Sequence, residues 1–216
     1  MFLVRLLLFA ICIVFLSLTT STLVEYFMCQ RPEYNPKLWN HSSIQTYNNC
    51  YIYALNKPKS SRTRKTSPGL GVKGAGESGT NDFGRDYSNY TCDYFDKLIK
   101  NDIPGAIRHN VNSIDKLRCP SNYYEIALVL DDNGTPHKSG DDDFHFYRKD
   151  CGTEYWSHKP GSAPVTKKDA SGNLIIDPQH SNRNFPNHNY YNFCGYYCVP
   201  NKTKTYDNTK TELNIN

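Results

Sequence analysis

Hydrophobic residues occur in a few short runs along a chain that is otherwise polar. The first run, residues 6–18 (LLLFAICIVFLSL), follows the basic residue Arg5 and precedes the small polar residues 19–22 (TTST). A charged start, an apolar core of this length and small residues after it are typical of a secretory signal peptide. We therefore expect residues 1–22 to be a signal peptide or, if they are not cleaved, a signal anchor that tethers the chain to a membrane.

Two later segments have the pattern of short helices packed on a core. Residues 48–56 (NNCYIYALN) begin with two asparagines, which cap helices well, and Pro58 follows them and ends the helix. Residues 91–100 (TCDYFDKLIK) carry apolar side chains at helical spacing, and residues 114–117 are expected to form another short helix.

The second half of the chain carries strand patterns. Residues 123–130 (YYEIALVL) are rich in apolar and aromatic side chains, and residues 143–149 (DFHFYRK) alternate between side-chain classes. A four-residue loop at 150–153 (DCGT) would then return the chain along residues 154–159 (EYWSHK). A last strand is expected at 191–199, so helices packed on an antiparallel sheet make the fold class α+β.

The remaining segments are predicted to be loops. Residues 57–80 are basic and rich in Gly and Ser, and residues 69–74 (GLGVKG) match the dinucleotide-binding pattern GxGxxG. That pattern requires a strand before it and a helix after it, and neither is predicted here. We expect one domain over residues 23–199, with 57–80 as a long loop and 200–216 as a disordered tail.

Composition and charge narrow the classes of function. The chain has 216 residues, of which 38% are hydrophobic, with 17 Tyr and a net charge of +4. This charge is too small and too scattered to indicate a nucleic-acid partner. Four N-glycosylation motifs, at Asn40, Asn89, Asn133 and Asn201, agree with a secreted, extracellular glycoprotein.

The cysteine count indicates an oxidising compartment. Cys12 lies in the expected signal peptide, which leaves seven of the eight cysteines in the mature chain. Six can form three disulfides, whose pairing the sequence does not give, and an odd cysteine means a free thiol or an intermolecular bridge.

Cys50 and two histidines form the main candidate site. If the hairpin loop is 150–153, counting along both strands pairs His145 with His158 on one face of the sheet. Cys50 would begin a helix, where unpaired N–H groups lower the pKa of a thiol, and His145 would exchange its proton. His158, with Asp177 behind it, would hold His145 in the required orientation. For each residue the alternative is structural: a disulfide for Cys50 and ordinary strand positions for the histidines.

No metal or cofactor is predicted. The spacing of Cys194 and Cys198 relative to His180 and His188 is not that of a zinc site. The acidic residues 141–143 could bind calcium weakly, but such a run is more often a solvated loop.

Three segments resemble the papain-like amidases and peptidases of the NlpC type, including the CHAP amidases. They are Asn49-Cys50-Tyr51, residues 143–148 (DFHFYR) and residues 156–161 (WSHKPG). The resemblance implies a short nucleophile helix packed on an antiparallel sheet, here stapled by disulfides. Cys50 would attack an amide carbonyl, His145 would shuttle the proton, and His158 or Asp177 would orient it. Pro58 makes the helix shorter than in that family.

The same motifs resemble, less closely, secreted matrix proteins of mineralised mollusc shells. Two hypotheses therefore remain: a secreted cysteine amidohydrolase, and a non-catalytic structural protein of an extracellular or biomineral matrix. The partner would be an extracellular peptide, a peptidoglycan-like polymer or a matrix polymer.

Overall fold

The fold is described from a computed structural model of the chain, which covers residues 29, 31–60, 67–69, 91–109, 114–131 and 143–201. The chain divides into two compact units, Met1–Gln30 and Arg31–Asn216, and Cys29 alone represents the first unit among the described residues. The predicted signal peptide, most of the predicted 57–80 loop and nearly all of the predicted tail lie outside the described residues.

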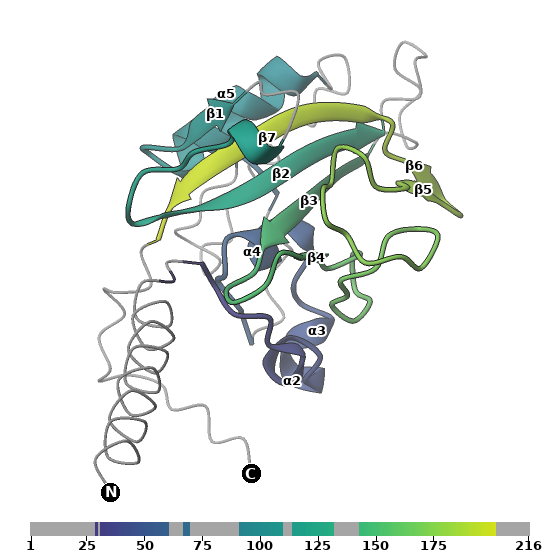
Figure 1. The fold of residues 1–216 in the computed structure, drawn as a ribbon. Helices are drawn as coiled ribbons and strands as arrows, with labels where there is room; N and C mark the ends of the chain where they lie inside the picture. The colour runs from purple at the N-terminus through teal and green to yellow at the C-terminus, as the bar shows by residue number, and fades with distance from the viewer. Residues whose placement is uncertain are drawn as a thin grey trace, which may run out of the picture. The chain divides into compact units, whose positions relative to one another are not determined.

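The second unit is built on an antiparallel sheet of five strands in the order β1-β7-β2-β3-β4 (Figure 1). The strands are β1 (Ile107–His109), β2 (Tyr123–Asp131), β3 (Asp143–Lys149), β4 (Trp156–His158) and β7 (Asn192–Pro200). A separate two-stranded ribbon consists of β5 (Asn184–Phe185) and β6 (His188–Asn189). Helices together with an antiparallel sheet confirm the predicted α+β class.

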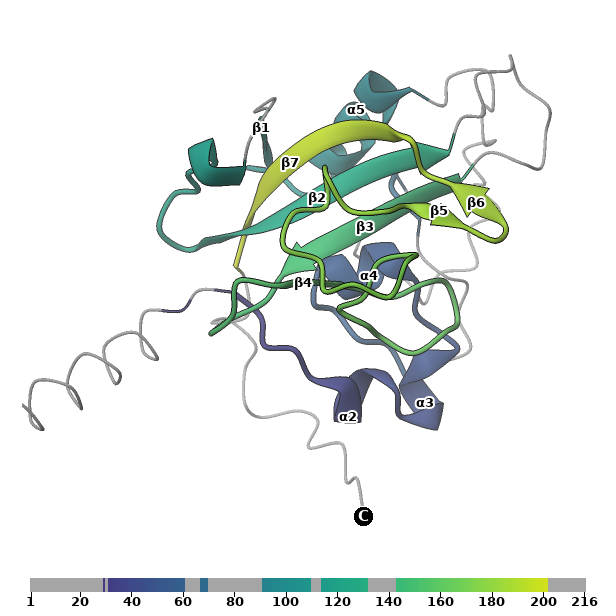
Figure 2. The ribbon, with the colours of Figure 1, turned by 45° about the vertical axis from the view of Figure 1, so that its right-hand side comes forward.

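Two helices cover one face of this sheet, and irregular chain covers the other (Figure 2). The helices are α4 (Cys50–Ala54) and α5 (Cys92–Asp102). The opposite face is packed by residues that follow the 3-10 helix η2 (Ile114–Lys116) and by residues between β4 and β7. Two short helices, α2 (Pro36–Trp39) and α3 (Ser42–Gln45), precede α4 and share a small cluster with it.

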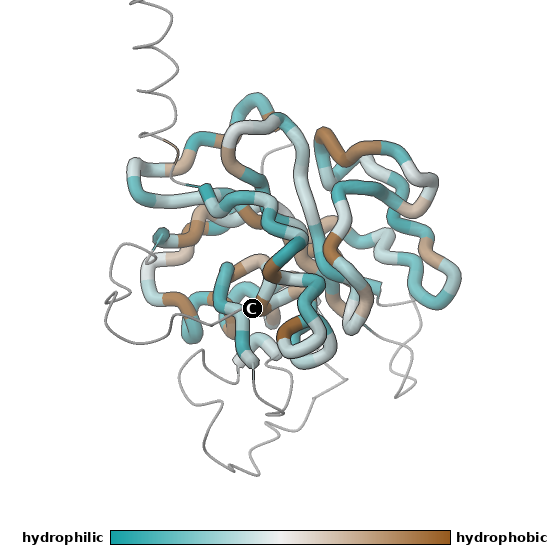
Figure 3. The backbone as a smooth tube through the Cα atoms, turned by 90° about the horizontal axis from the view of Figure 1, so that it is seen from below, coloured by the Kyte–Doolittle hydropathy of each residue, from teal (hydrophilic) through white to brown (hydrophobic). Residues whose placement is uncertain are grey.

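Burial on both faces explains why β2 is a continuous apolar run. Ile126 and Leu128 face the helices, whereas Ala127 and Val129 face the irregular chain. A strand with one solvated face alternates apolar and polar residues, but a strand covered on both faces does not. Figure 3 colours the described backbone by hydropathy: hydrophobic stretches are short and lie between longer hydrophilic ones.

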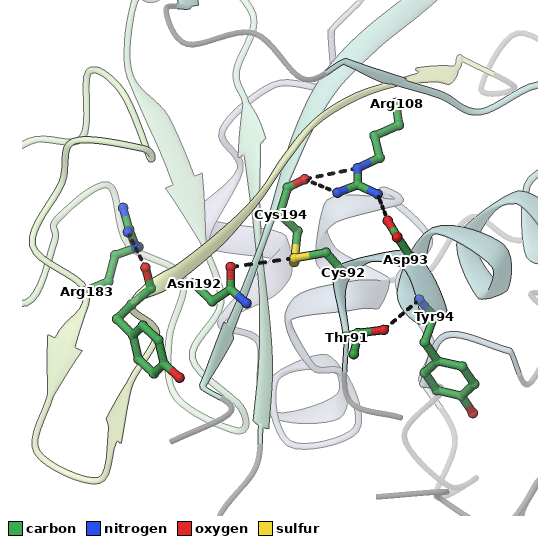
Figure 4. The surroundings of a disulfide bond; sticks show 9 residues. Thr91, Cys92, Asp93, Tyr94, Arg108, Arg183, Asn192 and Cys194 are labelled. Atoms are coloured by element: carbon green, nitrogen blue, oxygen red, sulfur yellow. Dashed lines mark hydrogen bonds and ion pairs between the residues drawn. A yellow bond between two sulfur atoms is a disulfide. The ribbon is translucent and has the colours of Figure 1, made fainter. Parts of the chain in front are cut away.

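A β-bulge in β7 orients two cysteines to opposite faces of the sheet. The register moves from Leu128↔Gly195 to Val129↔Phe193, so Cys194 is the extra residue. Gly195 has φ of 128°, a conformation that residues with a side chain rarely adopt. Cys194 therefore faces the helices and bonds to Cys92 of α5 (Figure 4), while Cys198 faces the other way and bonds to Cys119.

The guanidinium of Arg148 connects α4 to the sheet from a fully buried position. It donates hydrogen bonds to the Tyr53 carbonyl at 3.1 Å, to the Tyr53 hydroxyl at 3.0 Å and to Glu33 O at 3.0 Å. Its counter-charge is Asp150, at 3.2 Å, which also accepts a bond from Ser157 of β4 at 2.8 Å. Burial raises the pKa of Asp150, although the charge of Arg148 and these bonds lower it.

The predicted elements and the structure agree best where the strands are longest. The strand predicted at 143–149 has these bounds, and those predicted at 123–130 and 191–199 differ by a residue. The helices predicted at 48–56 and 91–100 are also present, and 114–117 is a 3-10 turn. The short elements α2, α3, β1, β5 and β6 were not predicted.

Replacing Arg148 with Met should lower the free energy of unfolding by about 3–5 kcal/mol, because it leaves the Asp150 carboxylate buried without its partner. Denaturant titration measures this. Asp150→Asn should also destabilise, and the double variant should lose less than the sum of the single losses. Lys100→Met, which removes an exposed ion pair with Asp96, is the control and should cost less than about 1 kcal/mol. Equal losses at Arg148 and Lys100 would contradict this account.

Candidate functional site

Cys50 is the first residue of α4, and two asparagines determine where that helix begins. The Asn49 side chain accepts a hydrogen bond from the Ile52 N–H at 3.2 Å and so caps the helix. The side chain of the buried Asn48 donates to the Lys59 carbonyl at 2.8 Å and accepts from the Lys59 N–H at 3.0 Å. The predicted helix start at Cys50 is therefore confirmed.

The thiol of Cys50 is packed in the core between α4 and β3. Only 5% of the residue is exposed, and its Sγ donates a hydrogen bond to the Phe144 carbonyl oxygen at 3.7 Å. Burial raises the pKa of Cys50 to about 12, and the charge of Asp143 adds to the rise. Main-chain N–H groups, including that of Phe146, offset little of it. The predicted lowering of this pKa is wrong, because burial outweighs the start of a five-residue helix.

Cys50 is also the free cysteine of the described chain. The six other cysteines that the structure describes are all disulfide-bonded, as the odd count allowed. The structural alternative for Cys50, a disulfide, therefore does not hold in this structure.

The two histidines meet on the sheet face that is turned away from α4. Nε2 of His145 lies 2.7 Å from Nδ1 of His158, and both residues are at least 97% buried. Nε2 of His158 lies 2.9 Å from the main-chain oxygen of Lys168. Because a carbonyl oxygen only accepts, His158 must donate through Nε2, and its Nδ1 must accept from Nε2–H of His145. Both tautomers follow from this chain of bonds.

The pairing of the strands differs from the predicted one by two residues. His158 lies opposite Tyr147, and Trp156 lies opposite Lys149, so the loop covers residues 150–155. Asp150, the first residue of this longer loop, is fully buried and pairs with Arg148. A shift of two residues keeps each side chain on its face, because strand side chains alternate with period two. The imidazoles therefore still meet, but diagonally.

Both imidazoles are held in the neutral form. Burial lowers the pKa of His145 well below 6.5, and repulsion from His158 and His188 lowers it further. Burial lowers the pKa of His158 to about 4, although the Lys168 carbonyl and the charge of Asp169 oppose the change. Because burial disfavours the charged form, the pair takes up a proton only at an energetic cost.

Asp177 does not lie behind His158. Its carboxylate accepts hydrogen bonds from the Gln179 N–H at 2.9 Å and from the Tyr196 hydroxyl, and it pairs with His180 Nδ1 at 2.9 Å. The predicted position of Asp177 is therefore corrected: a main-chain carbonyl, that of Lys168, orients His158 instead.

Sequence reasoning missed aromatic neighbours of the histidines, Phe185 and Tyr190 among them. The ring of Tyr190 lies 5.2 Å from that of His145, and the Tyr190 hydroxyl donates to Asp143 Oδ2 at 2.6 Å. Tyr190 immediately precedes the strand predicted at 191–199, and nothing in the sequence there marks its contact with His145.

Comparison with known proteins gives one informative match. No protein family description and no solved structure matches the chain. A curated protein, insoluble matrix shell protein 1 of Ruditapes philippinarum, is 31% identical over 153 residues, which are 69% of this chain and 80% of the relative. The chain belongs to the family of this shell matrix protein. The family supports the fainter of the two predicted resemblances, and these comparisons lend no support to the NlpC-type amidases.

Membership of this family agrees with the other extracellular features of the chain. Its disulfides and its shell matrix relative are consistent with a secreted, extracellular protein. Within the described ranges, no helix is long and apolar enough to cross a membrane, and no group of three His, Cys, Asp or Glu side chains is arranged to hold a metal ion.

The neutral histidines should make folding sensitive to acid. The pKa of His158 is about 4 in the folded chain and about 6.5 when unfolded, so below pH 6.5 the unfolded chain binds protons that the folded chain does not. The free energy of unfolding should fall by about 3 kcal/mol from this residue as pH drops from 6.5 to 4. Urea unfolding across this range measures the slope, which should flatten in His158→Gln. Parallel slopes for the two proteins would contradict the assignment.

Proposed function

We propose that this chain is a non-catalytic structural protein of an extracellular, mineralised matrix. The observation that carries the proposal is its family: the relative is named as an insoluble matrix protein of a shell, and the match covers most of both chains. The chemistry of Cys50 supports the same conclusion, since a thiol with a pKa of about 12 is protonated at every physiological pH.

The folded unit has the properties that such a role requires. Disulfides fix α5 and the segment after η2 to the two faces of β7, and the buried Arg148 network fixes α4 to the sheet. Several large apolar side chains remain at the surface, among them Leu174, Ile176 and Tyr191. Disulfides and the buried ion pair of Arg148 keep the unit folded, and exposed apolar and polar side chains can contact other components of an insoluble matrix.

The proposal is tested by locating the protein in its source tissue. An antibody against the folded chain should detect it in the organic residue that remains after the mineral is dissolved, and extraction should require a denaturant. Recovery of the chain only from cells or from the mineral-free body fluid would contradict a matrix role.

The arrangement of Cys50, His145 and His158 also supports a second candidate function, that of a papain-like cysteine amidohydrolase. A free cysteine begins a helix on an antiparallel sheet, and β3 of that sheet carries a histidine oriented by a second histidine. We infer that the scaffold is papain-like in arrangement. Within the described chain, however, Cys50 bonds to the Phe144 carbonyl and not to His145, and its thiol is almost inaccessible.

Hydrolysis of an amide bond that depends on Cys50 would support this second candidate. Wild type and Cys50→Ala should be compared on peptide amides and on peptidoglycan fragments, with product formation followed by mass spectrometry. The matrix proposal predicts no difference between the two proteins. Turnover by wild type that is lost in both Cys50→Ala and His145→Ala would replace it with the hydrolase.

A further inference from the structure

A cavity of about 330 Å³ lies at the end of β3, apart from the histidine pair. Its walls include three cations, Arg31, Arg118 and Lys149, two carboxylates, Asp115 and Glu125, and the apolar residues Ile114, Leu117 and Trp156. Pockets that bind small molecules have volumes of about 300–1,000 Å³. The cavity is therefore large enough for one sugar ring with its substituents, and larger than an inorganic anion requires.

Two of the three cations at this cavity have no carboxylate bonded to them among the described contacts. Arg31 is neutralised by Glu125 through two bonds of 2.7 Å. The guanidinium of Arg118 donates only to main-chain oxygens, at 2.6 and 2.8 Å, and the Lys149 ammonium donates to the Glu154 main-chain oxygen. Burial and the charge of Arg31 lower the pKa of Lys149, although the charges of Glu125, Glu154 and Asp150 oppose the change.

The floor of the cavity is aromatic and apolar. The Lys149 Nζ lies 5.8 Å from the ring of Trp156, and Leu117 packs in the same buried cluster as that ring. The indole Nε1 of Trp156 is buried and donates to no atom of the described chain. Ile114, which is only partly buried, also lines the cavity, and such apolar surface suits the C–H face of a sugar.

We propose that this cavity binds one residue of an acidic polysaccharide, with the sulfate or carboxylate of the sugar between Lys149 and Arg118. The proposal deepens the matrix function and rests on it for the presence of such a polymer. The net charge of +4 favours a polyanion over a neutral glycan. The apolar floor favours a sugar over an acidic peptide segment, whose carboxylates would leave it uncovered.

The test uses the folded, disulfide-bonded chain carrying Trp39→Phe, which leaves Trp156 as the remaining tryptophan of two. Its fluorescence is titrated with a sulfated hexasaccharide and with a hexagalacturonate, which separate sulfate from carboxylate as the source of the anion. A neutral hexasaccharide, a hexaglutamate peptide and inorganic sulfate are titrated in parallel. One or both acidic saccharides should change the Trp156 signal at concentrations where the other three do not.

Charge variants give the second readout. Lys149→Gln and Arg118→Gln should each weaken saccharide binding about tenfold or more, since each removes a charged hydrogen bond. Lys97→Gln, an equal charge change on the exposed face of α5, should leave the affinity within about twofold at the same salt concentration. Circular dichroism melting confirms that each variant is folded; if Lys149→Gln is not, Arg118→Gln alone decides.

Three results would overturn the proposal: equal binding of hexaglutamate or inorganic sulfate, equal weakening by Lys97→Gln, or no change in Trp156 fluorescence. Its failure is separate from that of the matrix function. If the chain is found in the mineral residue but does not bind acidic saccharides, only the proposal for the cavity is disproved. If the chain binds acidic saccharides but is absent from that residue, the matrix role is disproved.

Discussion

The buried charge of Arg148 is the constraint on which the rest of the arrangement depends. Its guanidinium satisfies main-chain oxygens of α4 and of the segment before it, stacks 4.1 Å from the ring of Tyr53 and pairs with Asp150. An ion pair removed from water is stabilised by hydrogen bonds to its other polar atoms, and here most of these atoms are bonded, although Arg148 Nε and Asp150 Oδ2 have no partner among the described residues. These contacts join α4, the 150–155 loop and, through Ser157, β4. The register of β4 brings His158 to His145.

Much of the sheet could be predicted because its strands are long and apolar, and its class followed from them. The odd cysteine count allowed a free thiol, and Cys50 carries it. The contact between His145 and His158 was predicted correctly although the strand pairing was not, because a shift of two residues keeps both side chains on the same face of the sheet. The sequence does not show how deeply each of these side chains is buried. The raised pKa of Cys50 and the position of Asp177 depend on packing between distant segments, and the opposite directions of Cys194 and Cys198 depend on a bulge at Gly195.

The same scaffold carries two chemically different regions. The centre, which holds Cys50 and the histidine pair, is buried and closed by aromatic rings such as Tyr190. The cavity beside Lys149 is lined by three basic and two acidic side chains. In a member of the insoluble matrix shell protein family, we therefore assign stability to the first region and recognition to the second. A helix-start cysteine with a histidine on the neighbouring strand does not by itself make a nucleophile, because the thiolate needs solvation that this core does not provide.

The most direct test of this account is the reactivity of Cys50 in the native, unreduced chain, followed with a thiol-alkylating reagent from pH 5 to 9 and located by peptide mass. We predict that Cys50 reacts only as fast as the chain unfolds, so that the rate rises with denaturant and gives no titration near neutral pH. Rapid labelling of Cys50 without denaturant, with a pKa well below the value of about 8.5 for an ordinary thiol, would contradict the account and favour a catalytic cysteine.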